Sequence, residues 1–149
     1  MISTSLEHKI IDTLPYATPF HFVERIFDVD KDRISGGYTY KKDEYFYKGH
    51  FKHVPVTPGV ILVETMGQIG MISHLIYLLK LYETKPLFYP LLSNMEADFF
   101  QRVYPDEMMT VNGLKIFYRN NTLRSTVEML NDKGELCVRA KFLLQFIFE

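Results

Sequence analysis

The chain has 149 residues, a length typical of one domain that buries a sizeable core without disulfides. A formal net charge of −1, with Lys and Arg dispersed along the sequence, excludes the basic surface of a nucleic-acid-binding protein. Cys137 is the only cysteine, which excludes an intrachain disulfide and a zinc site built from cysteines.

The start of the sequence, residues 1–8, lacks the basic flank and apolar core of a signal peptide. No linker, internal repeat or low-complexity tract divides the chain. We therefore expect a single domain over residues 1–149, located in the reducing cytoplasm.

Two strands are predicted early in the chain, at residues 21–28 and 33–40. The polar segment Asp30-Lys31-Asp32 lies between them and is typical of a turn. A turn this short joins antiparallel neighbours, so we expect the two strands to pair.

A long helix is predicted from Pro58 to about Leu81 or Tyr82. Thr57 offers a side-chain oxygen at the N-cap, and Pro58 suits the first helical position because its missing N–H has no helical partner there. Pro86 ends the helix, since the residue before a proline disfavours helical backbone.

This helix is apolar on every side, which is the pattern of a helix buried all round. It is long enough to span a bilayer, but it carries Glu64, Gln68 and His74, which are costly in lipid. We therefore expect protein to enclose it. Close approach of neighbouring backbone is expected at three glycines that weaken helix propensity: Gly59, Gly67 and Gly70.

The rest of the chain predicts strands joined by turns. They are expected at residues 89–101, 108–118, 123–130 and 135–149. The last is the clearest, because apolar residues alternate along it with period two. The predicted fold is α+β, with an antiparallel sheet of five to six strands wrapped around one buried helix. Free sheet edges favour pairing with a second copy across a two-fold axis.

A group of residues around the helix start resembles a known family. The chain reads Gly49-His50-Phe51 and then Pro58-Gly59, with Glu64 fourteen residues after the histidine and Gln68 four residues further on. This pattern is similar to that of the bacterial 3-hydroxyacyl-acyl-carrier-protein dehydratases of type II fatty-acid synthesis, which have the hotdog fold. Segments on both sides also resemble the family: Leu14-Pro15, Pro19-Phe20, residues 23–25 and residues 99–105.

The resemblance implies roles for these residues. His50 would be the general base that removes the α-proton of the thioester. Glu64 would be the acid that protonates the departing C3 hydroxyl, and burial inside the helix would keep it protonated. A glutamate rather than an aspartate resembles the branch of the family that dehydrates without isomerising the double bond.

Supporting roles are also implied. Free amides in the first helical turn, at Gly59 and Val60, would hold the thioester oxygen as an oxyanion hole. Gln68 lies one turn beyond Glu64 and could orient its carboxyl group. Candidates for lining an acyl tunnel are Phe51, Phe100 and Tyr104.

The chain also departs from the family pattern. Lys52, His53 and Val54 stand where Pro, Gly and Lys are usual, and Tyr16 stands where a His is common. These changes concern substrate range more than chemistry. They leave open the acyl chain length, and whether the pathway makes fatty acids or a specialised polyene or polyketide.

The resemblance further implies the partners. The substrate would be carried by an acidic acyl-carrier protein, and two chains would share each active site in a homodimer, which could assemble as a trimer of dimers. No metal or organic cofactor is implied. Candidates for docking the carrier are the basic residues near the motif: Lys41, Lys42, Lys48, Lys52 and Arg102.

Alternatives remain. A hotdog thioesterase would cleave the thioester with a carboxylate and a water, and it would not need His50. A non-catalytic acyl-binding subunit would be free to lose His50 or Glu64. Either residue could also be structural, with Glu64 paired to a cation from a strand.

Overall fold

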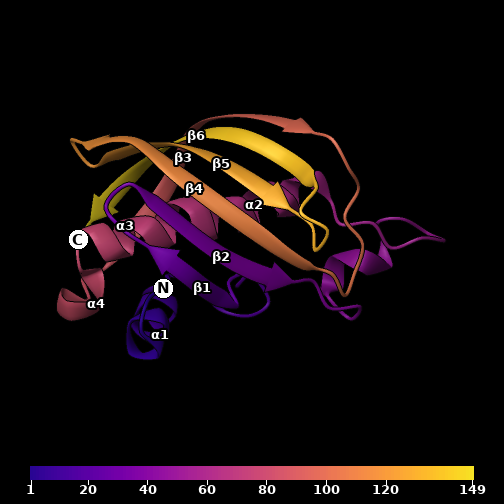
Figure 1. The fold of residues 1–149 in the computed structure, drawn as a ribbon, viewed down its shortest axis with the longest axis horizontal. Helices are drawn as coiled ribbons and strands as arrows, with labels where there is room; N and C mark the ends of the chain where they lie inside the picture. Colours follow the sequence, from indigo (N-terminus) through magenta and orange to yellow (C-terminus); the bar gives the residue numbers. More distant parts are fainter.

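A six-stranded antiparallel sheet wraps around a central helix in the computed structural model, which describes residues 1–149 (Figure 1). The elements are, in chain order, α1 (Thr4–Thr13), β1 (Arg25–Val29), β2 (Arg33–Thr39), the 3-10 helix η1 (Tyr45–Lys48), α2 (Gly59–Gly67), the π-helical turn η2 (Gln68–Ile72), α3 (Ser73–Leu78), α4 (Leu81–Thr84), β3 (Phe88–Phe99), β4 (Met108–Arg119), β5 (Thr122–Leu130) and β6 (Leu136–Phe148).

The sheet order is β1-β2-β4-β5-β6-β3, with every neighbouring pair antiparallel. The strand that follows the helix, β3, pairs with the last strand of the chain and forms one edge of the sheet. The sheet curves over one side of the helix, as Figure 1 shows. This is the predicted α+β hotdog architecture, which is confirmed.

The central helix differs from the prediction at both ends. It begins at Gly59 with Pro58 as the N-cap, and Thr57 caps nothing because its hydroxyl bonds to the hydroxyl of Tyr47 at 2.6 Å. At its far end α3 stops at Leu78, since Lys80 takes a left-handed conformation with φ of 51°. The predicted continuous end near residue 81 was therefore wrong, and α4 is a separate short turn.

Two of the three helix glycines permit close contacts, although the atoms nearest to a Cβ at either one belong to side chains rather than to the predicted neighbouring backbone. A Cβ at Gly59 would lie 3.1 Å from the ring of Phe99, and one at Gly70 would lie 2.7 Å from a methyl of Val127. Gly67 is different, because the nearest atom to its Cβ would be 4.0 Å away. The prediction of close approach at Gly67 was wrong.

The helix is buried all round only in its second half. From Thr65 to Ile76 every residue is buried, which the prediction required. In the first half Val60 is 73% exposed, and Val63 and Glu64 are only half-buried. These three positions follow the i, i+3, i+4 spacing of one helix face, so one stripe near the helix start is uncovered in the single chain. Although the segment Gly59–Leu78 is apolar enough to cross a membrane, 78% of its most apolar window is buried inside the protein.

The N-terminal helix α1 was not predicted. Ser3 caps it by accepting a hydrogen bond from the amide of Leu6 at 3.1 Å, and it packs against β1, α3 and α4. Its carboxylate Glu7 accepts bonds from the Arg25 side chain at 2.8 Å and the Ile26 amide at 2.9 Å. The Ser3 cap and the apolar spacing of Leu6 and Ile10 were signals available in the sequence.

Candidate active site

His50 lies in the loop between η1 and α2, and one hydrogen bond defines its tautomer. Its Nδ1 is 2.8 Å from the carbonyl oxygen of Val56. A carbonyl can only accept, so Nδ1 carries the proton and Nε2 keeps a free lone pair when the ring is neutral. The loop is closed by bonds from the Phe51 amide to the Val54 carbonyl, 2.7 Å, and from the Val56 amide to the His50 carbonyl, 2.9 Å. The His50–Phe51 peptide bond is cis, and the two rings stack at 4.0 Å.

Buried hydroxyl groups hold this loop against the helix start. The hydroxyls of Tyr47 and Thr57 are bonded to each other, and the Thr57 amide donates to the carbonyl of Val103 at 2.9 Å. Burial raises the pKa of Tyr47 to about 12, so its hydroxyl stays neutral. The loop that carries His50 is therefore attached to η1 on one side and to the segment after β3 on the other.

The first amides of α2 are free to bind an acceptor. Ile61 and Leu62 both donate to the carbonyl of Pro58, at 2.9 and 3.1 Å, whereas Gly59 and Val60 have no acceptor in the chain. Unpaired amides at a helix N-terminus carry partial positive charge. Because no side chain caps this end, both groups remain available for an anionic oxygen.

A cavity of about 370 Å³ brings His50 and the helix start together. Its walls come from the loop, the first turn of α2 and the end of β3 with the segment after it, and are formed by His50, Phe51, Val56, Thr57, Gly59, Leu62, Phe99, Phe100, Gln101, Arg102 and Val103. Two predicted tunnel residues, Phe51 and Phe100, are therefore placed here. Tyr104 is not part of this wall.

Gln68 positions the carboxyl group of Glu64. Its Nε2 donates to Glu64 Oε2 at 3.0 Å and to the carbonyl of Phe20 at 3.1 Å, while its Oε1 accepts from the amide of Phe22 at 2.8 Å. The amide side chain is fully buried, so all its bonds lie within the protein. The predicted contact between Gln68 and Glu64 is present.

Glu64 forms no ion pair with any cation of the chain, so the structural alternative of a salt bridge to a strand is wrong. Its burial is incomplete, contrary to the prediction, because the helix face that it shares with Val60 and Val63 is uncovered. It borders a second cavity, of about 100 Å³, which is separate from the one that contains His50. Within one chain the two predicted catalytic residues thus line different cavities.

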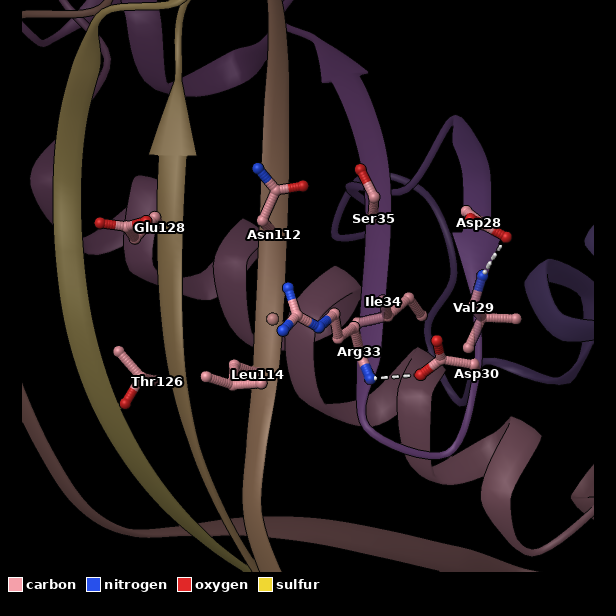
Figure 2. Close-up of a pocket in the computed structure, with 11 residues that line it drawn as sticks. Asp28, Val29, Asp30, Arg33, Ile34, Ser35, Asn112, Leu114, Thr126 and Glu128 are labelled. Atoms are coloured by element: carbon pink, nitrogen blue, oxygen red, sulfur yellow. Dashed lines mark hydrogen bonds between the residues drawn. The ribbon is translucent and has the colours of Figure 1, made fainter. Parts of the chain in front are cut away.

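Another hollow lies on the sheet face away from the helix. This cavity has a volume of about 430 Å³ and is lined by residues of β1, β2, β4 and β5. Figure 2 shows these residues. The carboxylates in the cavity wall already have partners. Asp28 pairs with the terminal amine, Asp30 accepts hydrogen bonds from two backbone amides of the adjoining turn, and Glu128 pairs with the side chain of Arg139. None of the predicted site residues lies in it, and its acids have structural explanations.

The basic residues near the motif differ in their pairing. Lys41 bonds to Glu24 at 3.4 Å and Lys42 to Asp106 at 3.2 Å. Lys48 and Lys52 form no ion pair and are exposed, and Arg102 lines the cavity at His50. No group of three or more His, Cys, Asp or Glu side chains is arranged to hold a metal ion.

Comparison with known proteins identifies similar sequences. A family model described as a FabA-like domain matches residues 14–141. Two curated relatives are 3-hydroxyacyl-acyl-carrier-protein dehydratases named FabZ: one from Variovorax paradoxus is 41% identical over 70 residues, 46% of this chain and 47% of the relative. The other, from Bacillus subtilis, is 38% identical over 69 residues, 46% of this chain and 49% of the relative. The matched segment thus spans about half the length of these relatives.

Solved structures share the fold at low sequence identity. A dehydratase heterocomplex, ApeI:P from Xenorhabdus doucetiae, has a TM-score of 0.75 at 13% identity, covering 91% of this chain and 89% of that one. A hypothetical thioesterase from Streptococcus pneumoniae, solved with coenzyme A, has a TM-score of 0.60 at 12% identity, covering 83% and 85%. The fold is therefore shared by proteins described as dehydratases and as thioesterases.

Proposed function

The chain belongs to the FabA-like domain family, and from this premise we propose that it is a dehydratase acting on a 3-hydroxyacyl thioester carried by acyl-carrier protein. The product is the trans-2-enoyl thioester, formed in fatty-acid synthesis or a related pathway. The observation that carries the proposal is the arrangement of His50. The His50 ring has a free lone pair on Nε2 and lines the same cavity as Gly59. Gly59 is the first residue of α2, where the backbone amides are unpaired.

The reaction begins at the carbon next to the thioester carbonyl. Nε2 of His50 takes the C2 proton, and the negative charge that develops on the thioester oxygen is held by the amides of Gly59 and Val60. The bond from Nδ1 to the Val56 carbonyl keeps the ring oriented while it becomes positively charged. Donors already fixed at the helix start need no rearrangement as the charge develops.

The reaction ends at C3. Glu64 gives its proton to the departing hydroxyl, the C3–O bond breaks, and the electrons from the C2–H bond form the double bond, so one water leaves. Gln68 holds one carboxyl oxygen of Glu64 and leaves the other free for this transfer. After turnover the proton on His50 and the negative charge on Glu64 are reset by proton exchange with solvent.

Two copies of the chain complete the site. His50 and Glu64 border different cavities in one chain, and the uncovered helix stripe with Glu64 lies on the same side as the edge strand β3. That strand exposes large apolar side chains, with Tyr89 and Leu91 each 47% exposed and Leu92 58% exposed. A long apolar edge strand is a template for pairing with another chain. In a homodimer, Glu64 of one protomer would meet His50 of the other.

The partner that delivers the substrate would be an acidic acyl-carrier protein in the cytoplasm. Lys48, Lys52 and Arg102 are the basic residues near the His50 loop without an ion pair in the chain. They are the best candidates for contacting acidic side chains of the carrier, because Lys41 and Lys42 are already paired.

The thioesterase alternative fits these contacts less well. A thioesterase that hydrolyses with a carboxylate and a water does not need His50. It would therefore not explain why a backbone carbonyl fixes the tautomer of this histidine, or why the ring lies beside free amides. The two activities are separated by their products. Loss of the enoyl absorbance with the thioester intact indicates hydration, whereas release of free thiol indicates hydrolysis.

The test is the hydration of a trans-2-enoyl thioester by purified variants. His50→Ala and Glu64→Gln should each lower kcat by about 10²-fold or more, the range for losing a positioned acid or base. His53→Ala and Glu83→Gln are matched controls, because both side chains are exposed and lie outside the two cavities. Wild-type turnover by either site variant, or thiol release without hydration, would reject the proposal.

A further inference from the structure

The second cavity, which Glu64 borders, is also lined by Tyr16, a residue that has no role in the reaction steps proposed above. Its wall is formed by Tyr16, Val63, Glu64, Gly67, Ile72, Pro90, Leu92, Met95, Phe142 and Leu144. Apart from the Glu64 carboxyl and the Tyr16 hydroxyl, the lining side chains are apolar. A hydrocarbon ligand is the chemistry that such a lining accepts.

The order of atoms in the substrate matches the order of groups in the protein. In the reaction proposed above, the thioester carbonyl binds at the helix start, C2 faces His50, and C3 faces Glu64. The acyl chain from C4 onward must therefore lie beyond Glu64, where this apolar cavity begins. The cavity measures about 100 Å³, against about 370 Å³ for the cavity at His50. At ~30 Å³ for each water-sized group, it holds on the order of three such groups.

Tyr16 is the aromatic side chain that the N-terminal segment adds to this wall. Its ring is partly buried and packs against Phe20, with ring centroids 6.4 Å apart. Its hydroxyl forms no hydrogen bond with another group of the chain, so nothing polar explains its position. Burial and then the charge of Glu64 raise the pKa of Tyr16 above its usual value, so the phenol stays neutral in the cavity.

The chain on both sides of Tyr16 is anchored. Leu14 is buried before it, and after it the Phe20 carbonyl and the Phe22 amide are both bonded to Gln68. The backbone that carries the ring is therefore held in place when a longer chain enters. From this geometry we propose that Tyr16 closes the acyl cavity and restricts the enzyme to short acyl chains, an inference that rests on the dehydratase function proposed above.

The experiment compares kcat/KM for hydration of enoyl thioesters with four to twelve carbons. The wild type should lose about tenfold or more between the six- and ten-carbon substrates, since a pocket discriminates by 10-fold or more when the added atoms do not fit. Tyr16→Ala should raise the ratio of ten-carbon to four-carbon kcat/KM by about tenfold or more. Tyr16→Leu is the second, less disruptive variant, and it should change the ratio in the same direction.

Two further variants test whether the effect depends on the hydroxyl group of Tyr16 and on the position of the tyrosine in the chain. Tyr16→Phe keeps the ring and should retain the preference for short chains, and Tyr45→Ala removes an exposed tyrosine that lies outside this cavity. Binding is measured in parallel by calorimetry with butanoyl and decanoyl thioesters of pantetheine, which have no hydroxyl group or double bond to react.

The outcomes are distinguishable. Turnover that shows no dependence on chain length, or a ratio unchanged in Tyr16→Ala and Tyr16→Leu, overturns the role of Tyr16 while the dehydratase function stands. A second outcome is that the butanoyl thioester binds more tightly than the decanoyl thioester, that this difference is lost in Tyr16→Ala and Tyr16→Leu, and that no substrate is turned over. This outcome supports the role of Tyr16 in the cavity and rejects the dehydratase function. Absence of both effects rejects both proposals.

Discussion

Gly113 of β4 lies directly against the backbone of Gly70 in the central helix. A Cβ at Gly113 would be 2.5 Å from the carbonyl oxygen of Gly70 and 3.0 Å from its Cα. Because both atoms belong to the helix backbone, no side chain can rotate to make room. The backbones of the sheet and the helix therefore come into close contact at this crossing, within the π-helical turn that begins at Gln68.

Replacing Gly113 with alanine should destabilise the fold. The helix backbone would have to shift away from β4, and overpacking of this kind costs about 1–3 kcal/mol. Chemical denaturation followed by circular dichroism measures the change. Asn112→Ala is the control, since this neighbouring side chain is exposed and its removal should change stability by less than about 0.5 kcal/mol. Equal stability of the two variants would show that the close contact is not required.

The fold was largely predictable because each strand has a strong local pattern. The last strand was predicted at residues 135–149 and observed as β6, Leu136–Phe148, since alternating apolar residues must face the helix. The π-helical turn could not be predicted in this way. It depends on Ser73, whose hydroxyl donates to the carbonyl of Gln68 at 2.7 Å, and on contacts of Gln68 with the distant residues Phe20 and Phe22.

A second prediction concerns Gly59. An alanine Cβ here would lie 3.1 Å from the Phe99 ring, so the ring or the helix start must move by a few tenths of an ångström. If the amides of Gly59 and Val60 form the oxyanion hole, Gly59→Ala should lower kcat more than it raises KM, by about tenfold or more.

The partner substitution tests the cause. Phe99→Leu makes space beside Gly59, so the double variant Gly59→Ala with Phe99→Leu should recover much of the lost kcat, and a double-mutant cycle should show coupling. Strict additivity of the two single effects would contradict the steric explanation.

A third prediction concerns pH and the buried His74. Its Nε2 donates to the carbonyl of Asp30 at 2.8 Å, and its Nδ1 is buried with no hydrogen-bond partner. Burial is the main cause that lowers the pKa of His74, and the charge of Lys115 adds to it, while the Asp30 carbonyl and the charges of Asp30 and Asp32 act in the opposite direction. The folded protein therefore keeps this ring neutral at a pH where the unfolded chain protonates it.

The sign follows from proton linkage. Below about pH 6.5 the unfolded state binds a proton that the folded state resists, so the free energy of unfolding should fall as pH falls, by up to about 1.4 kcal/mol per pH unit. His74→Gln, which cannot titrate, should show a shallower loss of stability between pH 6.5 and 5. His53→Gln, an exposed histidine, should behave as the wild type. Identical slopes for wild type and His74→Gln would disprove the effect.

The candidate site was only partly accessible to sequence reasoning. The spacing from His50 to Glu64 and Gln68 led to a segment in which the structure places a cavity at the helix start and a Gln68–Glu64 hydrogen bond, because the loop and the helix start are local in sequence. The incomplete burial of Glu64 was not predictable, since an apolar helix pattern does not reveal which stripe the sheet and loops leave uncovered. Tyr104 was assigned to the tunnel by its place in the sequence, but the wall of the His50 cavity ends at Val103.

The last prediction tests whether two protomers share each site. His50→Ala and Glu64→Gln are each expected to be inactive, because every dimer site would lack either its base or its acid. Co-expressed in equal amounts, the two chains should form heterodimers in which one site has both residues intact and the other has neither. Random pairing makes about half of the dimers mixed, each with one working site of two, so about a quarter of wild-type activity should return. If His50 and Glu64 acted within one chain, no mixture could restore turnover, because every chain would still lack one of the two groups.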